Sequence, residues 1–236
     1  MRLLTKRKLY SFCSTCMNRE KYFEKTFFEN YNNLKSFFDD YFEYIILNYS
    51  SKGNLNDIFD TKMCNLDNVT YIVREDEEYF KHSHAKNIAH VNSKGDILVN
   101  VDCDNFISEN FLKRICSIFD LHSNNYVHGL KGIGLGGRIT ISRENFYKVG
   151  GYDERMISGW GYEDPELLER CRKMGLEVIK EKINGEKCFK QNNKERGENC
   201  LIKRIKKSDK LHRNLKGELS RSFGKDEVKI LKRCKY

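Results

Sequence analysis

The stretch Gly95-Asp96-Ile97-Leu98-Val99-Asn100-Val101-Asp102-Cys103-Asp104 places a short apolar run directly before two aspartates. The length and apolar character of this run predict a buried strand over residues 97–101. Side chains two positions apart on an extended backbone point to the same side. We therefore expect the carboxylates of Asp102 and Asp104 to lie on one face where the strand ends.

Similar apolar runs alternate with helical patterns through the first half of the chain. Strands are predicted at residues 9–13, 44–48, 69–73 and 97–101, and helices at residues 20–30, 55–59, 83–91 and 111–119. This alternation predicts an α/β fold with a central, mostly parallel sheet flanked by helices. Ligands bind at the carboxyl ends of strands in such sheets, so residues 13–19, 48–51 and 102–105 are candidate site segments.

The pattern changes in the second half of the chain. Five glycines within residues 129–137 predict a flexible segment. A strand is predicted at residues 138–142 and a short helix at residues 143–149, followed by a longer helix at residues 165–174. Beyond residue 192 the chain is basic, and its pattern determines little about its structure.

Composition narrows the class of protein. A chain of 236 residues predicts one large domain, or one domain with an appendage. The nine cysteines follow no regular framework and no secretory signal is recognisable, which favours reduced thiols and a cytoplasmic location. No apolar run approaches the ~20 residues that span a bilayer.

Positive charge is concentrated at the C-terminal end. Residues 180–236 hold 19 Lys and Arg against 8 Asp and Glu, whereas the net charge of the whole chain is +9. Such a segment suits peripheral contact with anionic lipid, and nucleic acid or an acidic glycan are alternative partners. The plain alternative is a solvated lysine-rich surface.

Asp102 and Asp104 supply hard oxygen ligands. Such ligands suit Mg²⁺ or Mn²⁺, whose remaining coordination positions go to water and phosphate. The alternative is a solvated Asp-Cys-Asp-Asn turn. Because a deeply apolar strand precedes the two aspartates, the sequence favours the metal site.

A second candidate site, Gly159-Trp160-Gly161-Tyr162-Glu163-Asp164, joins a glycine-rich turn to two carboxylates. Asp164 is the predicted N-cap of the helix at residues 165–174, with Pro165 at its first position and Gly175 just past its end. The helix N-terminus would lower the pKa of Asp164, keeping its carboxylate ionised and ready to accept a proton. The flanking glycines favour a loop in which Trp160 stacks on a sugar ring, over a tryptophan in the core.

Three further motifs carry weaker signals. Cys13 and Cys16 form a C-x-x-C pair without the second pair that zinc would need, and a redox role stays a minor alternative. Residues 132–137 match the glycine spacing of a dinucleotide-binding fingerprint. They precede a strand instead of a helix, which excludes a dinucleotide-binding site there. His82 and His84 flank Ser83, the predicted N-cap of its helix; both could reach the strand ends, but they are expected to be surface or capping residues.

Several segments, in their order along the chain, resemble a known family: residues 11–19, 46–51, 85–89, 95–105, 146–154 and 159–164. Together they resemble inverting glycosyltransferases of the GT-A fold, in the large family-2-like group. The later segments are similar to the C-terminal module of β-1,4-galactosyltransferases. The resemblance covers residues 10–172, and implies a GT-A domain over residues 1–191 followed by a basic tail.

The resemblance also implies a division of that domain. Residues 1–107 would form its nucleotide-binding half and residues 108–191 its acceptor-binding half, with the tail over residues 192–236. The implied activity is metal-dependent transfer of a sugar, of Gal, GalNAc or Glc type, from a nucleotide donor to a glycan hydroxyl. UDP is the expected nucleotide, and no specific nucleic acid partner is expected.

Residue roles follow from the same resemblance. Asp164 would be the catalytic base, and Asp104 the principal ligand of Mn²⁺ or Mg²⁺, with Asp102 contacting the metal or the ribose. The residues expected to contact the donor are Arg19, Asn48, Lys86, Asn87, Asp102, Gly136 and Gly137. Those expected to shape the acceptor site are Trp160, Gly161 and Glu163.

Two positions depart from the family pattern. Asn48 stands where relatives usually carry the acidic residue that reads uracil. Gln191 stands where relatives often carry a metal-binding histidine, and His212 is the other candidate for a third ligand. These departures keep open the alternative that the protein is a non-catalytic remnant that only binds nucleotide sugars. A third alternative, nucleic-acid binding, is disfavoured because aromatic residues are sparse in the tail. A related retaining group has Asn at the position of Asp164, so this aspartate indicates inversion.

Overall fold

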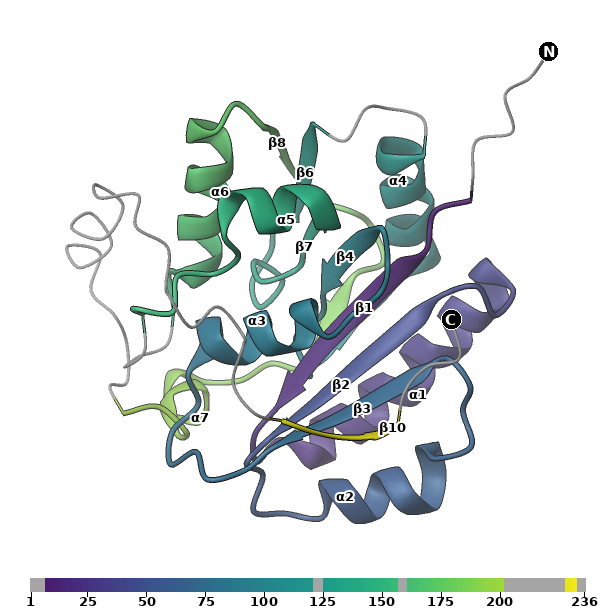
Figure 1. Ribbon diagram of the computed structural model, residues 1–236, viewed down its shortest axis with the longest axis vertical. Coiled ribbons are helices and arrows are strands. Elements are labelled where there is room, and N and C mark those ends of the chain that lie inside the picture. The colour runs from purple at the N-terminus through teal and green to yellow at the C-terminus, as the bar shows by residue number, and fades with distance from the viewer. Residues whose placement is uncertain (1–6, 121–124, 157–160, 202–227, 233–236) are drawn as a thin grey trace.

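An eight-stranded sheet forms the centre of the computed structural model, which describes residues 7–120, 125–156, 161–201 and 228–232 (Figure 1). Its strand order is β10-β3-β2-β1-β4-β7-β6-β8. The strands are β1 (Tyr10–Cys16), β2 (Glu43–Tyr49), β3 (Val69–Arg74), β4 (Ile97–Asn100), β6 (Tyr126–Leu130), β7 (Ile139–Ser142), β8 (Glu177–Glu181) and β10 (Lys229–Lys232). A two-stranded sheet pairs β5 (Asn105–Phe106) with β9 (Lys187–Cys188).

The sheet is mostly parallel, as predicted. Strands β1 to β4 run in one direction, β6 pairs parallel with β8, and the antiparallel pairings of the sheet involve β7 or β10. The helices are α1 (Glu20–Phe38), α2 (Leu55–Ile58), the π-helical η1 (Phe59–Met63), α3 (His82–Val91), α4 (Glu109–Phe119), α5 (Arg143–Val149), α6 (Glu163–Lys173) and α7 (Asn193–Gly197). The α/β fold class is therefore confirmed.

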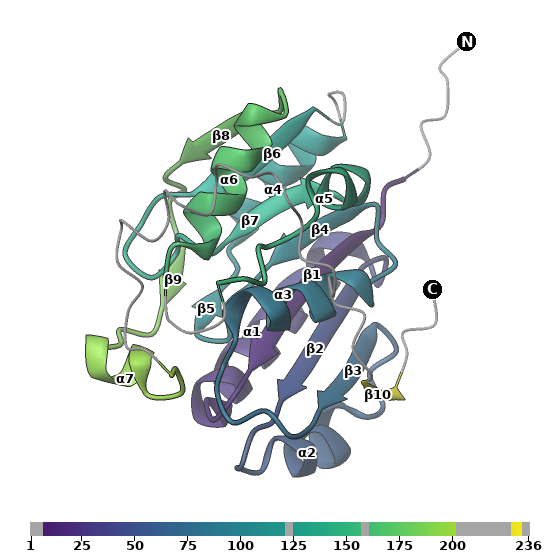
Figure 2. The ribbon, with the colours of Figure 1, turned by 60° about the vertical axis from the view of Figure 1, so that its left-hand side comes forward.

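Helices cover both faces of the sheet. Figure 2 shows α1 and α3 on opposite sides of β1 and β2. The α1 side holds the largest apolar cluster, which includes Phe23 and Phe27 of α1, and Tyr10 and Phe12 of β1. On the other side, α3 packs on β1 and β2, while α5 and α6 pack on β4, β6 and β7. Within the described residues, no helix is long and apolar enough to cross a membrane.

Helix α1 is longer than its predicted span of residues 20–30. The apolar face continues through Tyr31, Leu34 and Phe38, all of which are buried. The helix ends where Asp39 adopts a left-handed conformation with φ of 51°, and its N–H donates to the carbonyl of Lys35. A left-handed residue at this position is a common helix stop.

Several predicted boundaries are wrong. Gly129 lies in β6 rather than in a flexible segment, and α3 begins at His82, so Ser83 is inside the helix instead of capping it. The N-cap of α6 is Tyr162, with φ of 72°, and Asp164 is the second helical residue. Gly175, with φ of 82°, does follow the end of α6 as predicted.

The basic segment contributes to the main sheet. Strand β10 pairs antiparallel with β3 at one edge, through Lys229 opposite Val73 and Ile230 opposite Ile72. Farther upstream, the Nδ2 group of Asn199 donates to the carbonyl of Met17 at 2.8 Å. Residues beyond 192 thus contact the end of β1.

Candidate active site

A cavity of about 340 Å³ opens at the carboxyl ends of β1 and β4. The chain reverses its direction of travel across the sheet between these two neighbouring strands, a topology that leaves a crevice for ligands. The residues that line the cavity come from segments far apart in the sequence: Thr15, Met17, Arg19, Phe80, His82, Lys86, Asp102, Cys103, Asp104, Gly132, Gly134, Gly136, Gly137, Gly161, Glu163, Asp164, Pro165, Lys180, Gln191, Asn199 and Cys200.

Asp102 and Asp104 line this cavity from a turn, not from the extended strand that the sequence predicted. Strand β4 ends at Asn100, and the N–H of Asn105 donates to the carbonyl of Asp102 at 2.9 Å. The Nδ2 group of Asn100 donates to Asp102 Oδ1 at 3.1 Å, and that of Asn105 donates to Asp104 Oδ1 at 2.8 Å. Flanking asparagines therefore orient both carboxylates.

Gln191 lies against Asp104. Its Nε2 donates to Asp104 Oδ2 at 2.9 Å, and the N–H of Phe189 donates to the carbonyl of Asp104 at 2.9 Å. Among the described residues, no group of three or more His, Cys, Asp or Glu side chains could hold a metal ion. His212, the other predicted third ligand, lies outside the described residues.

Two carboxylates of α6 share one buried ammonium group. The Nζ of Lys86 lies 2.6 Å from Asp164 Oδ1 and 3.1 Å from Glu163 Oε1, and only 4% of the Lys86 side chain is exposed. The same Nζ lies 5.1 Å from the centre of the Tyr152 ring. Lys86 comes from α3, so this ion-pair cluster fixes α3 relative to the start of α6.

Burial and charge set the pKa values of this cluster. Burial raises the pKa of Asp164 to about 8; the nearby Glu163 and Asp102 carboxylates add to this, and Lys86 opposes it. Burial alone would raise the pKa of Glu163, but Lys86 and His82 lower it to about 2. For Lys86, the three carboxylates outweigh burial and hold its pKa well above the usual value. The predicted lowering of the Asp164 pKa by the helix N-terminus is wrong, because burial outweighs the helix dipole.

The glycine-rich loop packs closely on Asp102. A Cβ placed on Gly137 would lie 2.4 Å from Asp102 Oδ2, whereas a Cβ on Gly136 would meet no atom within 4 Å. Gly161, with φ of 100°, also faces open space. The loop thus leaves no room for a side chain at Gly137 and free space at Gly136.

We expect Gly137→Ala to lower any activity that depends on Asp102. A non-bonded carbon needs about 1 Å more than the available 2.4 Å, and misplacement on that scale costs roughly a hundredfold in rate. Gly136→Ala is the matched control for folding, since its methyl group has space. Steady-state rates and melting temperatures of both variants test this, and equal rates in the two variants would contradict it.

Two predicted donor contacts do not line the cavity. Asn48 is buried, with its Nδ2 donating to Asn56 Oδ1 at 2.9 Å and its Oδ1 accepting from the N–H of Ser51 at 2.9 Å. Asn87 binds both backbone groups of Tyr152, at 2.8 and 2.9 Å. Both asparagines thus hold the chain that surrounds the cavity, and their predicted contact with a donor finds no support in their placement. Trp160 lies outside the described residues.

Other residues of the cavity were not chosen as site residues from the sequence patterns. Phe80 and His82 precede the predicted helix, while Lys180, Asn199 and Cys200 come from the basic segment. His82 lines the cavity with its Nδ1 buried and without a hydrogen-bond partner among the described residues, and burial lowers its pKa. Its spacing to Lys86, one helical turn, was the available sequence signal.

The C-x-x-C pair does not form a redox motif. Cys13 and Cys16 both lie in β1, both are buried, and neither opens a helix. Burial raises the pKa of the Cys13 thiol well above its usual value. A buried thiol of this kind is unreactive.

Comparison with known families matches two models to adjoining parts of the chain. Residues 13–129 match glycosyltransferase like family 2, and residues 121–192 match the family described as N-terminal domain of galactosyltransferase. The chain belongs to the GT-A glycosyltransferases. Comparison with curated protein sequences found no match to this glycosyltransferase.

Solved structures show the same fold at low sequence identity. Drosophila beta1,4galactosyltransferase 7, in complex with xylobiose, has a TM-score of 0.63 at 15% identity, over 96% of this chain and 87% of that one. A Pyrobaculum calidifontis mannosyltransferase with GDP-Man and Mn²⁺ has a TM-score of 0.60 at 14% identity, over 75% and 55%. Mycobacterium tuberculosis glucosyl-3-phosphoglycerate synthase has a TM-score of 0.59 at 14%, over 80% and 73%. The glycosyltransferase thus spans about half of the mannosyltransferase chain.

Proposed function

We propose that the chain is a metal-dependent inverting glycosyltransferase that moves a hexose from a UDP-sugar to a hydroxyl of a glycan. One observation carries this proposal: the Asp102–Asp104 turn and the Glu163–Asp164 pair line the same cavity. The first pair suits the donor's diphosphate and its metal, and the second suits the acceptor. A cavity with both can bring a donor sugar and an acceptor hydroxyl together.

The residues present fit a divalent cation. Asp102 and Asp104 offer carboxylate oxygens, and the amide of Gln191 can turn to present its oxygen beside Asp104. Mg²⁺ and Mn²⁺ keep several positions for water and phosphate, so two carboxylates and a diphosphate are a sufficient set. When bound, the ion would neutralise charge on the leaving diphosphate. Solved structures of similar fold that contain Mn²⁺ support this assignment.

Asp164 would act as the base in a single displacement. As the acceptor oxygen forms its bond to the anomeric carbon, the bond from that carbon to the diphosphate breaks, and Asp164 accepts the hydroxyl proton. Glu163, ionised beside Lys86, can accept a hydrogen bond from a second acceptor hydroxyl. One displacement inverts the configuration at the anomeric carbon. Binding of both sugars in one orientation supplies much of the remaining acceleration.

The choice of UDP and of a hexose rests on the relatives. A variant of the Drosophila enzyme was solved with manganese, UDP-Gal and xylobiose, and the Mycobacterium tuberculosis enzyme with Mn²⁺ and UDP. The mannosyltransferase was solved with GDP-Man, so guanine nucleotides belong in any test. Peripheral contact with a membrane through the basic tail and a cytoplasmic location stay predictions.

Release of nucleotide from a panel of donors tests the proposal. The panel holds UDP-Gal, UDP-GalNAc, UDP-Glc, UDP-GlcNAc and GDP-Man, each with and without Mn²⁺, for the wild type and for Asp104→Asn. We expect metal-dependent release from one donor, which Asp104→Asn abolishes. Donor binding without release, with acceptors supplied, would instead support a binding remnant, the function that Asn48 and Gln191 keep open.

Gln191→His should tighten the binding of Mn²⁺. An imidazole nitrogen is a stronger electron-pair donor than a neutral amide, relatives often carry a metal-binding histidine at this position, and residue 191 already contacts Asp104. We expect roughly a tenfold lower half-saturating Mn²⁺ concentration in nucleotide release. Gln191→Ala is the control, and should weaken activation by Mn²⁺. An unchanged Mn²⁺ dependence in both variants would exclude residue 191 from the metal site.

A further inference from the structure

Five lysines lie on the segments that border one side of the cavity, and are called here the lysine rim: Lys131, Lys180, Lys182, Lys187 and Lys190. Lys180 lines the cavity itself. The N–H of Lys131 donates to the carbonyl of Glu181 at 2.7 Å, which places Lys131 beside the end of β8 and next to Gly132 of the cavity wall. Lys182 directly follows that strand end.

The other two members of the rim lie on the segment that contacts Asp104. Lys190 stands between Phe189 and Gln191, both of which hydrogen-bond to Asp104. Lys187 is in β9, where the adjacent Cys188 Sγ donates to the carbonyl of Ile133 at 3.3 Å. The Phe189 ring packs against Tyr22 at 5.2 Å and Phe106 at 5.3 Å, between ring centres. The backbone that carries these lysines is thus held in place.

The charge of the rim is not neutralised by its neighbours. None of its five lysines forms an ion pair with a described residue. Two carboxylates on the same segments have other partners: Glu181 binds Arg114 at 2.7 Å and His128 at 3.0 Å. Glu186 is buried against Arg138 and accepts the N–H of Ser108 at 2.9 Å. Five positive charges that form no ion pair with a described residue, gathered on segments at one side of a cavity, create a field that attracts anions.

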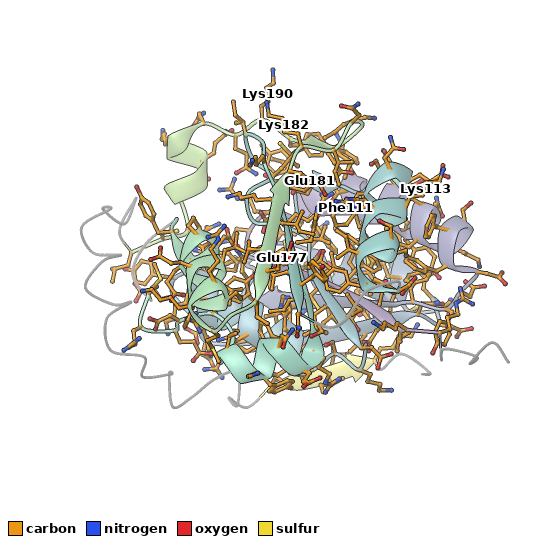
Figure 3. All side chains as sticks on the ribbon, turned by 90° about the horizontal axis from the view of Figure 1, so that it is seen from above. Phe111, Lys113, Glu177, Glu181, Lys182 and Lys190 are labelled. Carbon is orange, nitrogen blue, oxygen red and sulfur yellow. The ribbon has the colours of Figure 1, made fainter. Side chains whose placement is uncertain are left out.

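A donor nucleotide accounts for only part of this charge. Lys180 faces the cavity, where a diphosphate could reach it, but Lys131, Lys182, Lys187 and Lys190 are exposed outside it. Figure 3 shows Lys182 and Lys190 projecting outward at the same end of the molecule. These exposed groups fit a ligand that extends beyond the cavity.

We propose that the acceptor is a negatively charged glycan, and that the lysine rim binds the carboxylate, phosphate or sulfate groups of its outlying residues. This inference rests on the proposed function and names its acceptor class. On the described segments that carry the rim lysines, the exposed large apolar side chain is that of Ile133, 89% exposed. One such side chain gives little apolar area for insertion into a bilayer, so the rim favours a glycan over a lipid surface.

Binding of charged and neutral oligosaccharides tests the proposal. The probes are a chondroitin sulfate octasaccharide, a neutral dextran oligosaccharide of equal length, and phosphatidylglycerol vesicles. The test variant is the triple substitution Lys182→Gln, Lys187→Gln and Lys190→Gln. The control carries Lys35→Gln, Lys148→Gln and Lys173→Gln, which removes the same charge from the exposed surfaces of α1, α5 and α6.

We expect the wild type and the control variant to bind the sulfated probe but not the neutral one. This binding should weaken as the salt concentration is raised. The test variant should bind it roughly tenfold more weakly, since each exposed contact contributes modestly. Equal binding by test and control variants, or binding to vesicles but not to the octasaccharide, would overturn the proposal. UDP binding with Mn²⁺, measured alongside, should be equal in all three proteins. If none of the three proteins bound UDP, the proposed transferase function would be overturned instead.

Discussion

Replacing Asp164 with asparagine should lower the rate of sugar transfer by roughly a thousandfold and leave the binding of UDP unchanged. The amide of asparagine cannot take up the hydroxyl proton, although it has nearly the shape of the carboxylate. Its oxygen can still accept the hydrogen bond that Lys86 donates to Asp164 at 2.6 Å, so the fold should persist. Turnover at saturating donor and calorimetric titration with UDP measure the two effects separately.

The control is Glu169→Gln on the same helix. Glu169 lies 3.7 Å from Lys173, and 40% of its side chain is exposed. An exposed pair of this kind contributes little to stability, so transfer should stay within about twofold of the wild type. If Asp164→Asn keeps more than a tenth of wild-type turnover, another group is the base, and Glu163→Gln would be the next variant to assay.

Much of the fold was predictable because apolar periodicity reports burial. Strands that are buried throughout and mostly apolar, such as β2 and β4, were placed within a residue or two, as were α3 and α5. Strand β6 was missed because His128 and Gly129 interrupt its apolar run, although both residues are paired within the sheet. Strand β8, Glu-Val-Ile-Lys-Glu, is a half-exposed edge whose charges resemble a loop.

The candidate site was predictable as two motifs but not as one cavity. The Asp102–Asp104 turn and the Glu163–Asp164 pair were both identified, because each follows a recognisable element. What the sequence could not give is the pairing of Lys86 with Asp164, which lie 78 positions apart. That pairing depends on α3 packing beside the start of α6. The pKa of Asp164 is raised instead of lowered because the carboxylate is buried, and Lys86 opposes this rise only in part.

The cluster of Lys86, Glu163 and Asp164 couples folding to catalysis. One ammonium group serves two buried carboxylates, so a negative charge is left over, and burial penalises it. In the wild type, the pKa of Asp164 is raised to about 8 even with Lys86 beside it. Because the base must be ionised, kcat/KM of the wild type should rise with pH through about 8.

Lys86→Met should shift that rise to higher pH and destabilise the fold. Without the ammonium group, burial and the Glu163 carboxylate oppose ionisation of Asp164 more strongly, so its pKa increases further. Removing one partner of a buried ion pair costs about 3–5 kcal/mol in the free energy of unfolding. Transfer rates and urea unfolding, both measured as a function of pH, provide the two readouts.

The pH dependence of the stability loss separates charge from packing. The raised pKa of Lys86 means that its stabilisation is present below the ordinary lysine pKa and disappears as pH rises through the folded value. The difference between wild type and Lys86→Met should thus be full near pH 7. It should shrink near pH 4, where the uncompensated carboxylates of the variant take up protons. A difference that is constant from pH 4 to 8 would assign the loss to packing.

A second substitution tests which charge the ammonium group neutralises. Lys86→Met combined with Glu163→Gln leaves one buried carboxylate instead of two. Part of the lost free energy of unfolding should therefore be restored, whereas the transfer activity should not. Lys86→Arg keeps the positive charge and should keep the wild-type pH dependence. If Lys86→Met lowers transfer but leaves its pH dependence unchanged, Lys86 does not set the ionisation of Asp164. Its contribution would then be structural, through the contact of α3 with α6.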